Sequence, residues 1–170
     1  DEDGEVQRAP SVNGALAAGI PGLPAALVHL AEHYGSLPLS QSLAPAIAAA
    51  EEGFAGTTRY QALGGFRLEA MRNDPETARL FLRDNEIPAE GTLIKQPELA
   101  QTLRLLAAKG RAGFYQGALA EQLLEGVQAA GGIWQQADFD QYQVIEREPV
   151  SFMLGDTRVI TSPLPSAGGI

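Results

Sequence analysis

Apolar positions recur every three or four residues along most of the chain, which is the period of a helix face packed against a core. Glycine, proline and small polar residues interrupt this pattern and mark where helices begin and end. Helical segments are predicted over residues 23–34, 40–52, 57–72, 75–83, 95–109, 114–130 and 137–142. The chain is therefore expected to be mostly helical.

Residues at the helix ends support these boundaries. Asp74 followed by Pro75 is typical of a helix start, because an Asp side chain caps the first turn and proline fits the first helical position. Either Ser40 or Ser42 can cap the second helix in the same way. A pair of glycines at residues 64–65 weakens the third helical segment.

Short β-rich runs stand near the two ends of the chain. Residues 15–20 form an apolar run before a Pro-Gly pair, which predicts a short buried strand that enters a tight turn. Residues 149–153 and 157–161 predict a β-hairpin joined by residues 154–156. Strands so far apart leave their edges unpaired within this chain, and they therefore need a larger sheet. These runs and the helices together predict an α+β fold.

Composition places the chain among soluble globular proteins. It has 170 residues and a mass of 18.0 kDa, with 45% hydrophobic and 19% charged residues, which suits one domain with a core. The net charge of −9 and the scattered basic residues argue against nucleic acid or an anionic membrane surface as a partner. The absence of cysteine excludes thiol catalysis and disulfides from this sequence, and it suits an oxidising periplasm as well as a cytosol.

The two ends of the sequence give a further expectation. Residues 1–13 are polar and acidic and are predicted to form a loop. The sequence starts without Met or a signal-like apolar segment, and no run is long enough to span a membrane. The last residues form a Pro- and Gly-rich turn of the kind that usually connects two ordered elements. Both ends are therefore expected to interrupt a longer chain.

One short motif suggests metal chemistry. His29, Glu32 and His33 match the H-x-x-E-H arrangement of inverted zinc proteases, in which both histidines lie on one helix face and the glutamate is the general base. The match is short, and no third ligand stands in a recognisable context. The alternative is a pair of solvated histidines on an amphipathic helix. We assign no metal ligand in this sequence.

Other candidate groups have structural interpretations. A serine nucleophile needs a histidine and an acid within reach, and both histidines lie on one predicted helix. Ser166 is the most site-like serine because its surroundings are rich in glycine. Carboxylate pairs are typical of solvated helix ends, Trp134 and Tyr142 are typical of core or interface packing, and the glycine pairs lack the Lys-Ser/Thr of a phosphate loop. The carboxylate pairs are Glu51 with Glu52 and Asp138 with Asp140.

An ordered set of short motifs adds a more specific interpretation. The motifs are Ala15-Leu-Ala-Ala-Gly-Ile-Pro-Gly22, His33-Tyr-Gly35, Leu43-Ala-Pro-Ala46, Ala50-Glu-Glu-Gly-Phe54, Lys95-Gln-Pro-Glu-Leu-Ala100, Gly113-Phe-Tyr-Gln-Gly117, Asp138-Phe-Asp-Gln-Tyr142 and Pro163-Leu-Pro-Ser-Ala-Gly-Gly169. Their order and spacing resemble the large subunit of gamma-glutamyltransferases, also called gamma-glutamyltranspeptidases or glutathione hydrolases. The resemblance covers nearly the whole chain from Gly14 onward. Each motif is weak alone, but the ordered set is specific.

This resemblance implies a fold and a reaction. Members of the family are N-terminal-nucleophile hydrolases with a four-layer αββα core, and a precursor cuts itself into a large and a small subunit. The small subunit begins with the catalytic threonine, whose hydroxyl attacks the gamma-glutamyl amide while its own amine can act as base. The gamma-glutamyl group then passes to water or to an amino acid. The resemblance implies no cofactor and a periplasmic or secreted location.

The same resemblance implies that these residues are one part of the enzyme. Residues 14–170 are expected to be a partial large-subunit domain, incomplete at both ends. Its expected partners are the remainder of the large subunit, the small catalytic subunit, and gamma-glutamyl compounds such as glutathione. Such a part is expected to be inactive alone. The alternative is a stand-alone helical scaffold or interaction domain without catalysis.

The resemblance assigns few site residues to this sequence. Residues 163–169 resemble the Pro-Pro-Pro-Ser-Ser-Gly-Gly loop of the family's large subunit, so Ser166, Gly168 and Gly169 are predicted neighbours of the substrate pocket. Ala167 stands where the family commonly has serine and lacks its hydroxyl. No threonine here lies in the nucleophile motif, and Arg8 is too close to the Gly-Ile-Pro-Gly stretch to be the arginine that grips the substrate carboxylate. No catalytic residue is therefore assigned.

Overall fold

The computed structural model describes residues 8–166, which form a helical body with two short antiparallel strand pairs. The elements, in chain order, are η1 (Ala9–Ser11), η2 (Ala15–Ala17), α1 (Leu23–His33), α2 (Leu39–Glu52), β1 (Phe54–Ala55), α3 (Thr58–Gly65), α4 (Leu68–Arg72), α5 (Pro75–Phe81), β2 (Leu93–Ile94), α6 (Pro97–Lys109), α7 (Ala112–Tyr115), α8 (Gly117–Ala129), α9 (Gln136–Gln141), β3 (Val150–Leu154) and β4 (Thr157–Thr161).

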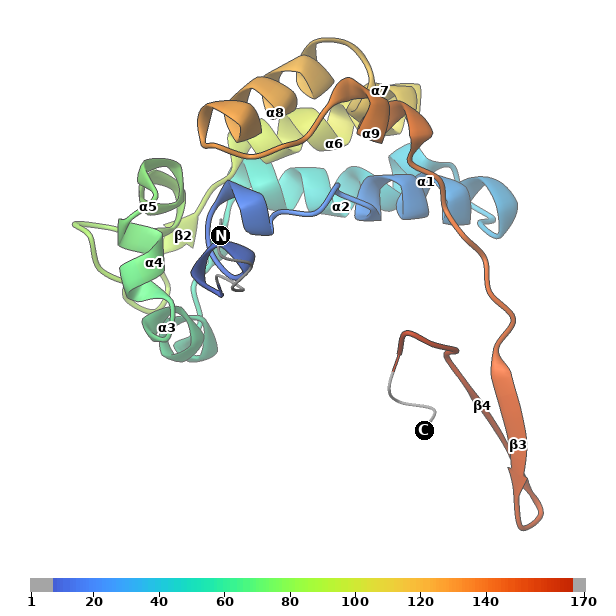
Figure 1. Ribbon diagram of the computed structural model, residues 1–170. Coiled ribbons are helices and arrows are strands. Elements are labelled where there is room, and N and C mark those ends of the chain that lie inside the picture. The colour runs from blue at the N-terminus through green and yellow to red at the C-terminus, as the bar shows by residue number, and fades with distance from the viewer. Residues whose placement is uncertain (1–7, 167–170) are drawn as a thin grey trace.

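The helices are arranged in layers (Figure 1). The most extensive contact between elements joins α2 to α6, and α7 and α8 follow α6 in the same part of the body. Helices α3, α4 and α5 gather in a lobe at one end of the body, and the β3–β4 hairpin projects away from it at the other end (Figure 1). The predicted α+β class with a C-terminal hairpin is confirmed.

The core lies where α1, α2 and α9 meet α6, α7 and α8. Phe139 of α9 is fully buried, and its ring centroid lies 5.7 Å from Tyr115, 5.7 Å from Trp134 and 6.5 Å from Phe114. Trp134 is buried as well, and its indole N–H donates to the Ala18 carbonyl at 2.9 Å. This confirms the prediction that Trp134 packs in the core. Aromatic pairs of this kind add to the stability that apolar burial provides.

Tyr115 joins α7 to the turn before α1. Its hydroxyl donates to the Pro21 carbonyl and accepts a hydrogen bond from the Ala25 N–H at 3.3 Å. The Tyr142 ring stacks on Tyr115 with centroids 5.7 Å apart, and its own hydroxyl lies over Gly22. A Cβ at Gly22 would come within 2.1 Å of that hydroxyl oxygen. Glycine at this position therefore permits the close approach of α9's end to the turn.

The predicted helices are present, with two differences in extent. The predicted segment 57–72 forms two helices, α3 and α4, which are separated just after the Gly64-Gly65 pair. The predicted segment 114–130 is likewise divided into α7 and α8 by Gln116, which has an extended backbone. An extended residue cannot continue a helix, so α7 and α8 replace one long helix at Gln116. Between α3 and α4 the interruption is at Arg67, whose φ of −118° and ψ of 5° are not helical.

Of the two helix caps predicted from the sequence, the one at α5 is present and the one at α2 is absent. Asp74 caps α5 as predicted, because its carboxylate accepts the Thr77 N–H at 2.7 Å. Hydrogen bonding by the Thr77 side chain, and then by its backbone N–H, lowers the pKa of the Asp74 carboxyl. The predicted Ser40 or Ser42 cap of α2 is wrong. This helix begins at Leu39 with no side-chain cap, directly after Pro38.

Residues 15–20 do not form the predicted strand. Ala15–Ala17 is a 3-10 helix, and the chain continues to Pro21 without a partner strand among residues 8–166. Side-chain donors bind the backbone here in place of a strand, because Trp134 and Tyr115 bind the carbonyls of Ala18 and Pro21. A short apolar run is compatible with a strand or with the observed 3-10 helix and irregular segment. The side chains that decide between these two structures lie far away in sequence.

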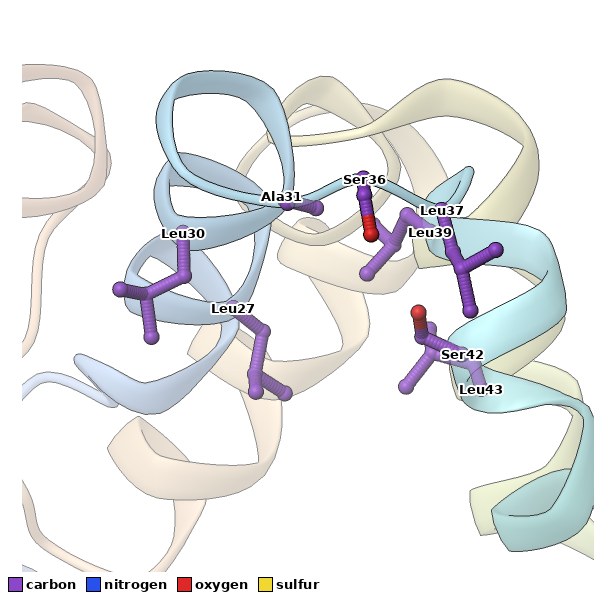
Figure 2. Close-up of a pocket in the computed structure, with 9 residues that line it drawn as sticks. Leu27, Leu30, Ala31, Ser36, Leu37, Leu39, Ser42 and Leu43 are labelled. Carbon is purple, nitrogen blue, oxygen red and sulfur yellow. The ribbon is translucent and has the colours of Figure 1, made fainter.

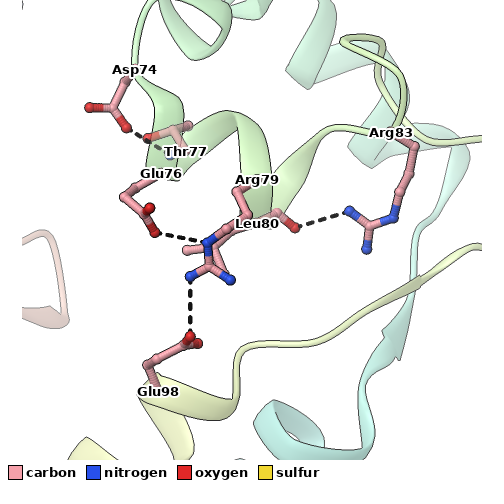
Figure 3. A network of polar contacts seen from close by, with 7 residues as sticks. All are labelled: Asp74, Glu76, Thr77, Arg79, Leu80, Arg83 and Glu98. Atoms are coloured by element: carbon pink, nitrogen blue, oxygen red, sulfur yellow. Dashed lines mark hydrogen bonds and ion pairs between the residues drawn. The ribbon is translucent and has the colours of Figure 1, made fainter.

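Two short paired strands, β1 and β2, connect the lobe of α3, α4 and α5 to the rest of the body. We call this strand pair the neck. Strand β1 pairs with β2 in antiparallel register, Phe54 with Ile94 and Ala55 with Leu93. The sequence pattern placed a loop up to residue 93 and missed this pair, because two residues are too few to show alternation. An exposed ion pair also links the lobe to α6, since Arg79 contacts Glu98 at 3.1 Å (Figure 3). Exposed pairs of this kind contribute about 0–1 kcal/mol, so this ion pair is a minor part of what holds the lobe.

The predicted hairpin is confirmed. Strands β3 and β4 pair in antiparallel register from Val150 with Thr161 to Leu154 with Thr157. Every residue of β3 is exposed, and Phe152 and Leu154 have exposed fractions of 46% and 70%. Cross-strand partners lie on the same face of a sheet, so Val150, Phe152 and Leu154 share one apolar face with Val159. No described segment covers this face, in agreement with the expectation of a larger sheet.

Candidate functional site

The turn that follows β4 contains Ser166, which the family resemblance associates with a substrate pocket. The chain leaves Thr161 and turns back on itself, and the Ser166 N–H donates to the Pro163 carbonyl at 3.1 Å. Gly168 and Gly169, the other two predicted pocket neighbours, lie outside the described residues. The part that these three residues take in a pocket stays a prediction.

The two histidines of the H-x-x-E-H motif lie side by side on α1. Their rings stack with centroids 4.1 Å apart and planes inclined by 24°. His33 Nδ1 donates to the His29 carbonyl at 3.0 Å, and His29 Nε2 lies 2.5 Å from Oε1 of Glu146. Within residues 8–166, no group of three or more histidines and carboxylates is placed to hold a metal ion. The two histidines therefore bind other groups of the same chain, and nothing supports the zinc hypothesis.

Glu146 connects α1 to the segment that precedes the hairpin. Its two carboxylate oxygens bind different donors, the Tyr34 hydroxyl at 2.7 Å and His29 Nε2 at 2.5 Å. These hydrogen bonds, that of Tyr34 first, hold the pKa of the Glu146 carboxyl below its ordinary value. The same bond raises the pKa of the Tyr34 phenol, so both groups keep their bonding forms at neutral pH. We name Glu146, His29 and Tyr34 the Glu146 clasp.

The Glu146 clasp was not predicted from the sequence. Its partners lie 117 and 112 residues before Glu146 in the chain. Glu146 itself stands in an exposed segment without regular structure, where neither helical spacing nor strand alternation gives a signal. The pairing becomes visible only when the fold brings α1 beside this segment.

Arg111 fastens the end of α9 to the core. Its guanidinium donates to the Phe139 carbonyl and to the Tyr142 carbonyl, each at 2.8 Å. The same group lies 4.8 Å from the Tyr115 ring centroid, a distance that allows a cation–π interaction. Burial raises the pKa of the Tyr115 phenol, so this hydroxyl stays protonated and can donate to its carbonyl partner. The hydrogen bonds of Arg111 to the Phe139 and Tyr142 carbonyls therefore fix the position of the C-terminal end of α9.

The paired carboxylates are helix-end residues, as predicted. Glu51 forms an ion pair with Arg104 of α6. Asp138 accepts the Gln135 N–H at 2.8 Å and closes a capping box at the start of α9. Asp140 accepts a hydrogen bond at 2.8 Å from a side chain of its own helix. Glu51, Asp138 and Asp140 thus each bind a structural partner, and these partners lie in different places.

An apolar groove of about 350 Å³ lies between α1 and α2. Figure 2 shows leucine side chains of both helices pointing into it, with the hydroxyls of Ser36 and Ser42 at its edge. The lining contains no titratable group and no backbone turn of the kind that stabilises a developing charge. The full lining is Leu27, Leu30, Ala31, Gly35, Ser36, Leu37, Leu39, Ser42 and Leu43. The groove is a packing surface and lacks the groups for catalysis.

Among the described residues, no helix is both long enough and apolar enough to cross a lipid bilayer.

Similarity to solved structures extends over almost every residue. The chain superposes on gamma-glutamyltranspeptidase of Helicobacter pylori with a TM-score of 0.94 and 34% identity, covering 99% of this chain and 49% of that one. The corresponding values for the Pseudomonas nitroreducens enzyme complexed with L-DON are 0.89, 33%, 99% and 49%. The fold is therefore that of part of the large subunit of an N-terminal-nucleophile hydrolase.

Sequence comparison identifies the family. The sequence model described as Gamma-glutamyltranspeptidase matches residues 1–170. The chain therefore belongs to the gamma-glutamyltranspeptidase family. It is also 34% identical over 171 aligned residues to a glutathione hydrolase proenzyme of Pseudomonas sp. (strain A14), covering 100% of this chain and 30% of that protein. The chain thus spans about a third of the length of this curated relative.

Proposed function

We propose that the chain is part of an enzyme that cleaves gamma-glutamyl amide bonds and passes the gamma-glutamyl group to water or to an amino acid. The family match over residues 1–170 carries this proposal, together with a fold match that extends over 99% of the chain. Glutathione is the proposed substrate, because the matched relative is named a glutathione hydrolase. The stand-alone scaffold hypothesis is disfavoured by the uncovered apolar face of the hairpin.

We propose that the catalytic threonine lies outside these residues. Two threonines that the structure describes in detail serve helix geometry. Thr57 caps α3 by accepting the Tyr60 N–H at 3.1 Å, and Thr102 donates to the Glu98 carbonyl at 3.1 Å. Neither threonine has a free amine beside it that can act as base, as the proposed mechanism requires. The nucleophile would therefore be supplied by the small subunit, and the 170-residue chain alone would have no activity.

The proposed partners are the remainder of the large subunit and the small subunit. The apolar face of β3–β4 supports this proposal, since a two-stranded sheet is marginally stable in water unless something covers it. The relative named a proenzyme supports maturation by cleavage. We also propose a periplasmic or secreted location, which the absence of cysteine permits. Cell fractionation that recovers the enzyme from the cytosol would contradict the proposed location.

The test of the proposed function is turnover of a gamma-glutamyl anilide. The complete polypeptide that carries these residues is expected to release the aniline and to yield a separate small subunit. The purified 170-residue chain is expected to release none under the same conditions. A complete polypeptide that matures but leaves the anilide intact would show that the proposed reaction is wrong, and so would turnover by the short chain alone.

Ser166 gives a sharper prediction about the substrate pocket, where we place it with Gly168 and Gly169. Replacing Ser166 by alanine in the complete enzyme is expected to raise KM by roughly 5- to 30-fold, the effect of losing one hydrogen bond of about 1–2 kcal/mol. The matched control is Ser162→Ala, a serine near the start of the same turn. Equal KM values for the two variants would remove Ser166 from the pocket.

A further inference from the structure

The segment between α9 and β3 carries the hairpin. Residues 143–149 have neither helical nor strand structure, and most of them are exposed. Val144 packs against the core, whereas Ile145 is 69% exposed. Figure 1 shows this segment leaving the helical body and running to the hairpin. The direction of the hairpin therefore depends on what holds residues 145–149.

Glu146 is the anchor of this segment. Both of its carboxylate oxygens are bound, one by His29 and the other by Tyr34. Its neighbours Arg147 and Glu148 have no side-chain hydrogen bond or ion pair within residues 8–166. The clasp is thus the polar contact that ties residues 145–149 to the helical body.

The donors of the clasp are held in place by α1. The ring of His29 stacks on His33, which is itself bonded to the His29 carbonyl, so the imidazole has a fixed orientation. Tyr34 is the C-terminal cap of α1, and its N–H binds the Leu30 carbonyl. Donors that are already ordered lose little conformational entropy when they bind a carboxylate. The clasp is solvent-exposed, with the Glu146 side chain 56% and the His29 side chain 24% exposed, so each contact contributes modestly and the two together favour one path of the segment.

We propose that Glu146 is a positioning residue that sets where the hairpin and the Ser166 turn stand relative to the helical body. This inference rests on the proposed function in one respect, namely that the Ser166 turn belongs to a substrate pocket. The turn follows β4 directly, so any rotation of the hairpin displaces it. The clasp thus acts on the pocket through the backbone and makes no contact with substrate.

The titratable groups of the clasp define the pH range in which its two hydrogen bonds, from His29 and Tyr34 to Glu146, are formed; we call this state closed. Glu146 faces His29, His33 and Tyr34 of α1, and the cavity beside His29 is also lined by Glu32 and Arg111. The Glu146 carboxyl has a lowered pKa, so its contribution is present above the ordinary carboxyl pKa and is lost as pH falls through the lowered value. The raised pKa of Tyr34 means that the phenol contributes until pH rises through that value. The clasp is therefore closed throughout the neutral range.

A distance measurement between two spin labels tests the proposal. In the complete polypeptide, with any cysteine outside these 170 residues replaced by serine, Glu121→Cys on α8 and Asp156→Cys in the hairpin turn can be labelled selectively, because these residues themselves include no cysteine. With Glu146 in place, we expect a narrow distance distribution. In the Glu146→Ala variant, we expect a distribution broadened by on the order of 10 Å, the spread of a free segment of this length.

Two further variants separate the clasp from general effects. Glu146→Gln keeps the shape and can still accept from His29, so it is expected to restore a narrow distribution. Glu148→Ala removes a carboxylate of the same segment that none of residues 8–166 binds, and it is expected to leave the distribution unchanged. A narrow distribution in Glu146→Ala, with the helix content unchanged by circular dichroism, would overturn the proposal.

The pH dependence of the distance distribution is a second test. If the carboxylate charge of Glu146 holds the segment, the distributions with Glu146 and with Glu146→Gln should respond differently to acid. The distribution of the chain with Glu146 is expected to broaden as pH falls through the lowered carboxyl pKa, whereas that of Glu146→Gln is expected to stay constant. Identical pH responses would contradict the role of the carboxylate. These distances do not depend on turnover, so failure of the proposed enzymatic function and failure of the clasp can be told apart.

Discussion

Replacing Phe139 by alanine should lower the free energy of unfolding by about 3–5 kcal/mol, which is the typical cost of removing a large aromatic side chain from a core. Phe139 is fully buried and contacts the rings of Phe114, Tyr115 and Trp134. These neighbours come from different segments, so they cannot all move to fill the space left behind. Urea denaturation followed by far-UV circular dichroism measures the change.

A matched substitution controls for the loss of a phenylalanine as such. Phe66 is 85% exposed between α3 and α4, and its replacement by alanine should change stability by less than about 0.5 kcal/mol. Equal destabilisation by the two substitutions would mean that the core is not centred on Phe139. A destabilisation of Phe139→Ala below about 1 kcal/mol would contradict the packing as described.

Placing a charge on the apolar face of the hairpin should weaken self-association of the 170-residue chain by roughly 10- to 100-fold. Phe152 lies on this face with Val150, Leu154 and the half-buried Val159, and every residue of β3 is exposed. We expect uncovered apolar faces of two copies to bind each other. Burying a phenylalanine contributes about 1.5–3 kcal/mol, which Phe152→Asp removes. Sedimentation equilibrium over a range of protein concentrations measures the association constant.

Ser151→Asp is the control for this prediction. It adds the same charge one residue earlier, and strand alternation places it on the opposite face of the hairpin. We expect it to change the association constant much less than Phe152→Asp does. A wild-type chain that remains monomeric at high concentration, without binding an apolar dye, would show that the hairpin face needs no cover.

Local signals in the sequence predicted the helices and the hairpin well. Asp74 with Pro75 marked the start of α5 because the cap is formed by residues next to one another. The hairpin was predicted because two β-rich runs flank a tight turn that contains Gly155, whose φ is positive. In both places the interacting residues lie close together in the chain, so the pattern contains the information needed.

Contacts between distant residues explain what the sequence pattern missed. The run at residues 15–20 looked like a strand, but Trp134 binds the Ala18 carbonyl within it and Tyr115 binds the Pro21 carbonyl just after it. No strand among residues 8–166 pairs with the run. The Glu146 clasp joins residues that are more than a hundred positions apart. Neither outcome follows from local periodicity, because each depends on how the helices pack.

The candidate site could be inferred from the sequence only through family resemblance. Spacing alone suggested a zinc site at His29 and His33, and the structure shows that both rings bind protein groups instead. The ordered motifs indicated the correct family, which the match over residues 1–170 confirms. The pocket role of Ser166 stays a prediction, since Gly168 and Gly169, the other predicted pocket neighbours, lie outside the described residues.

The most direct measurement is the location of the catalytic nucleophile. The complete polypeptide would be treated with an electrophilic glutamine analogue, digested, and mapped by mass spectrometry, with the 170-residue chain treated in parallel. We predict a single modified residue, the N-terminal threonine of a separate small subunit, and no modification of the 170-residue chain. Modification of any residue within this chain, at a rate that matches loss of turnover, would contradict the proposal that it supports the catalytic threonine without containing it.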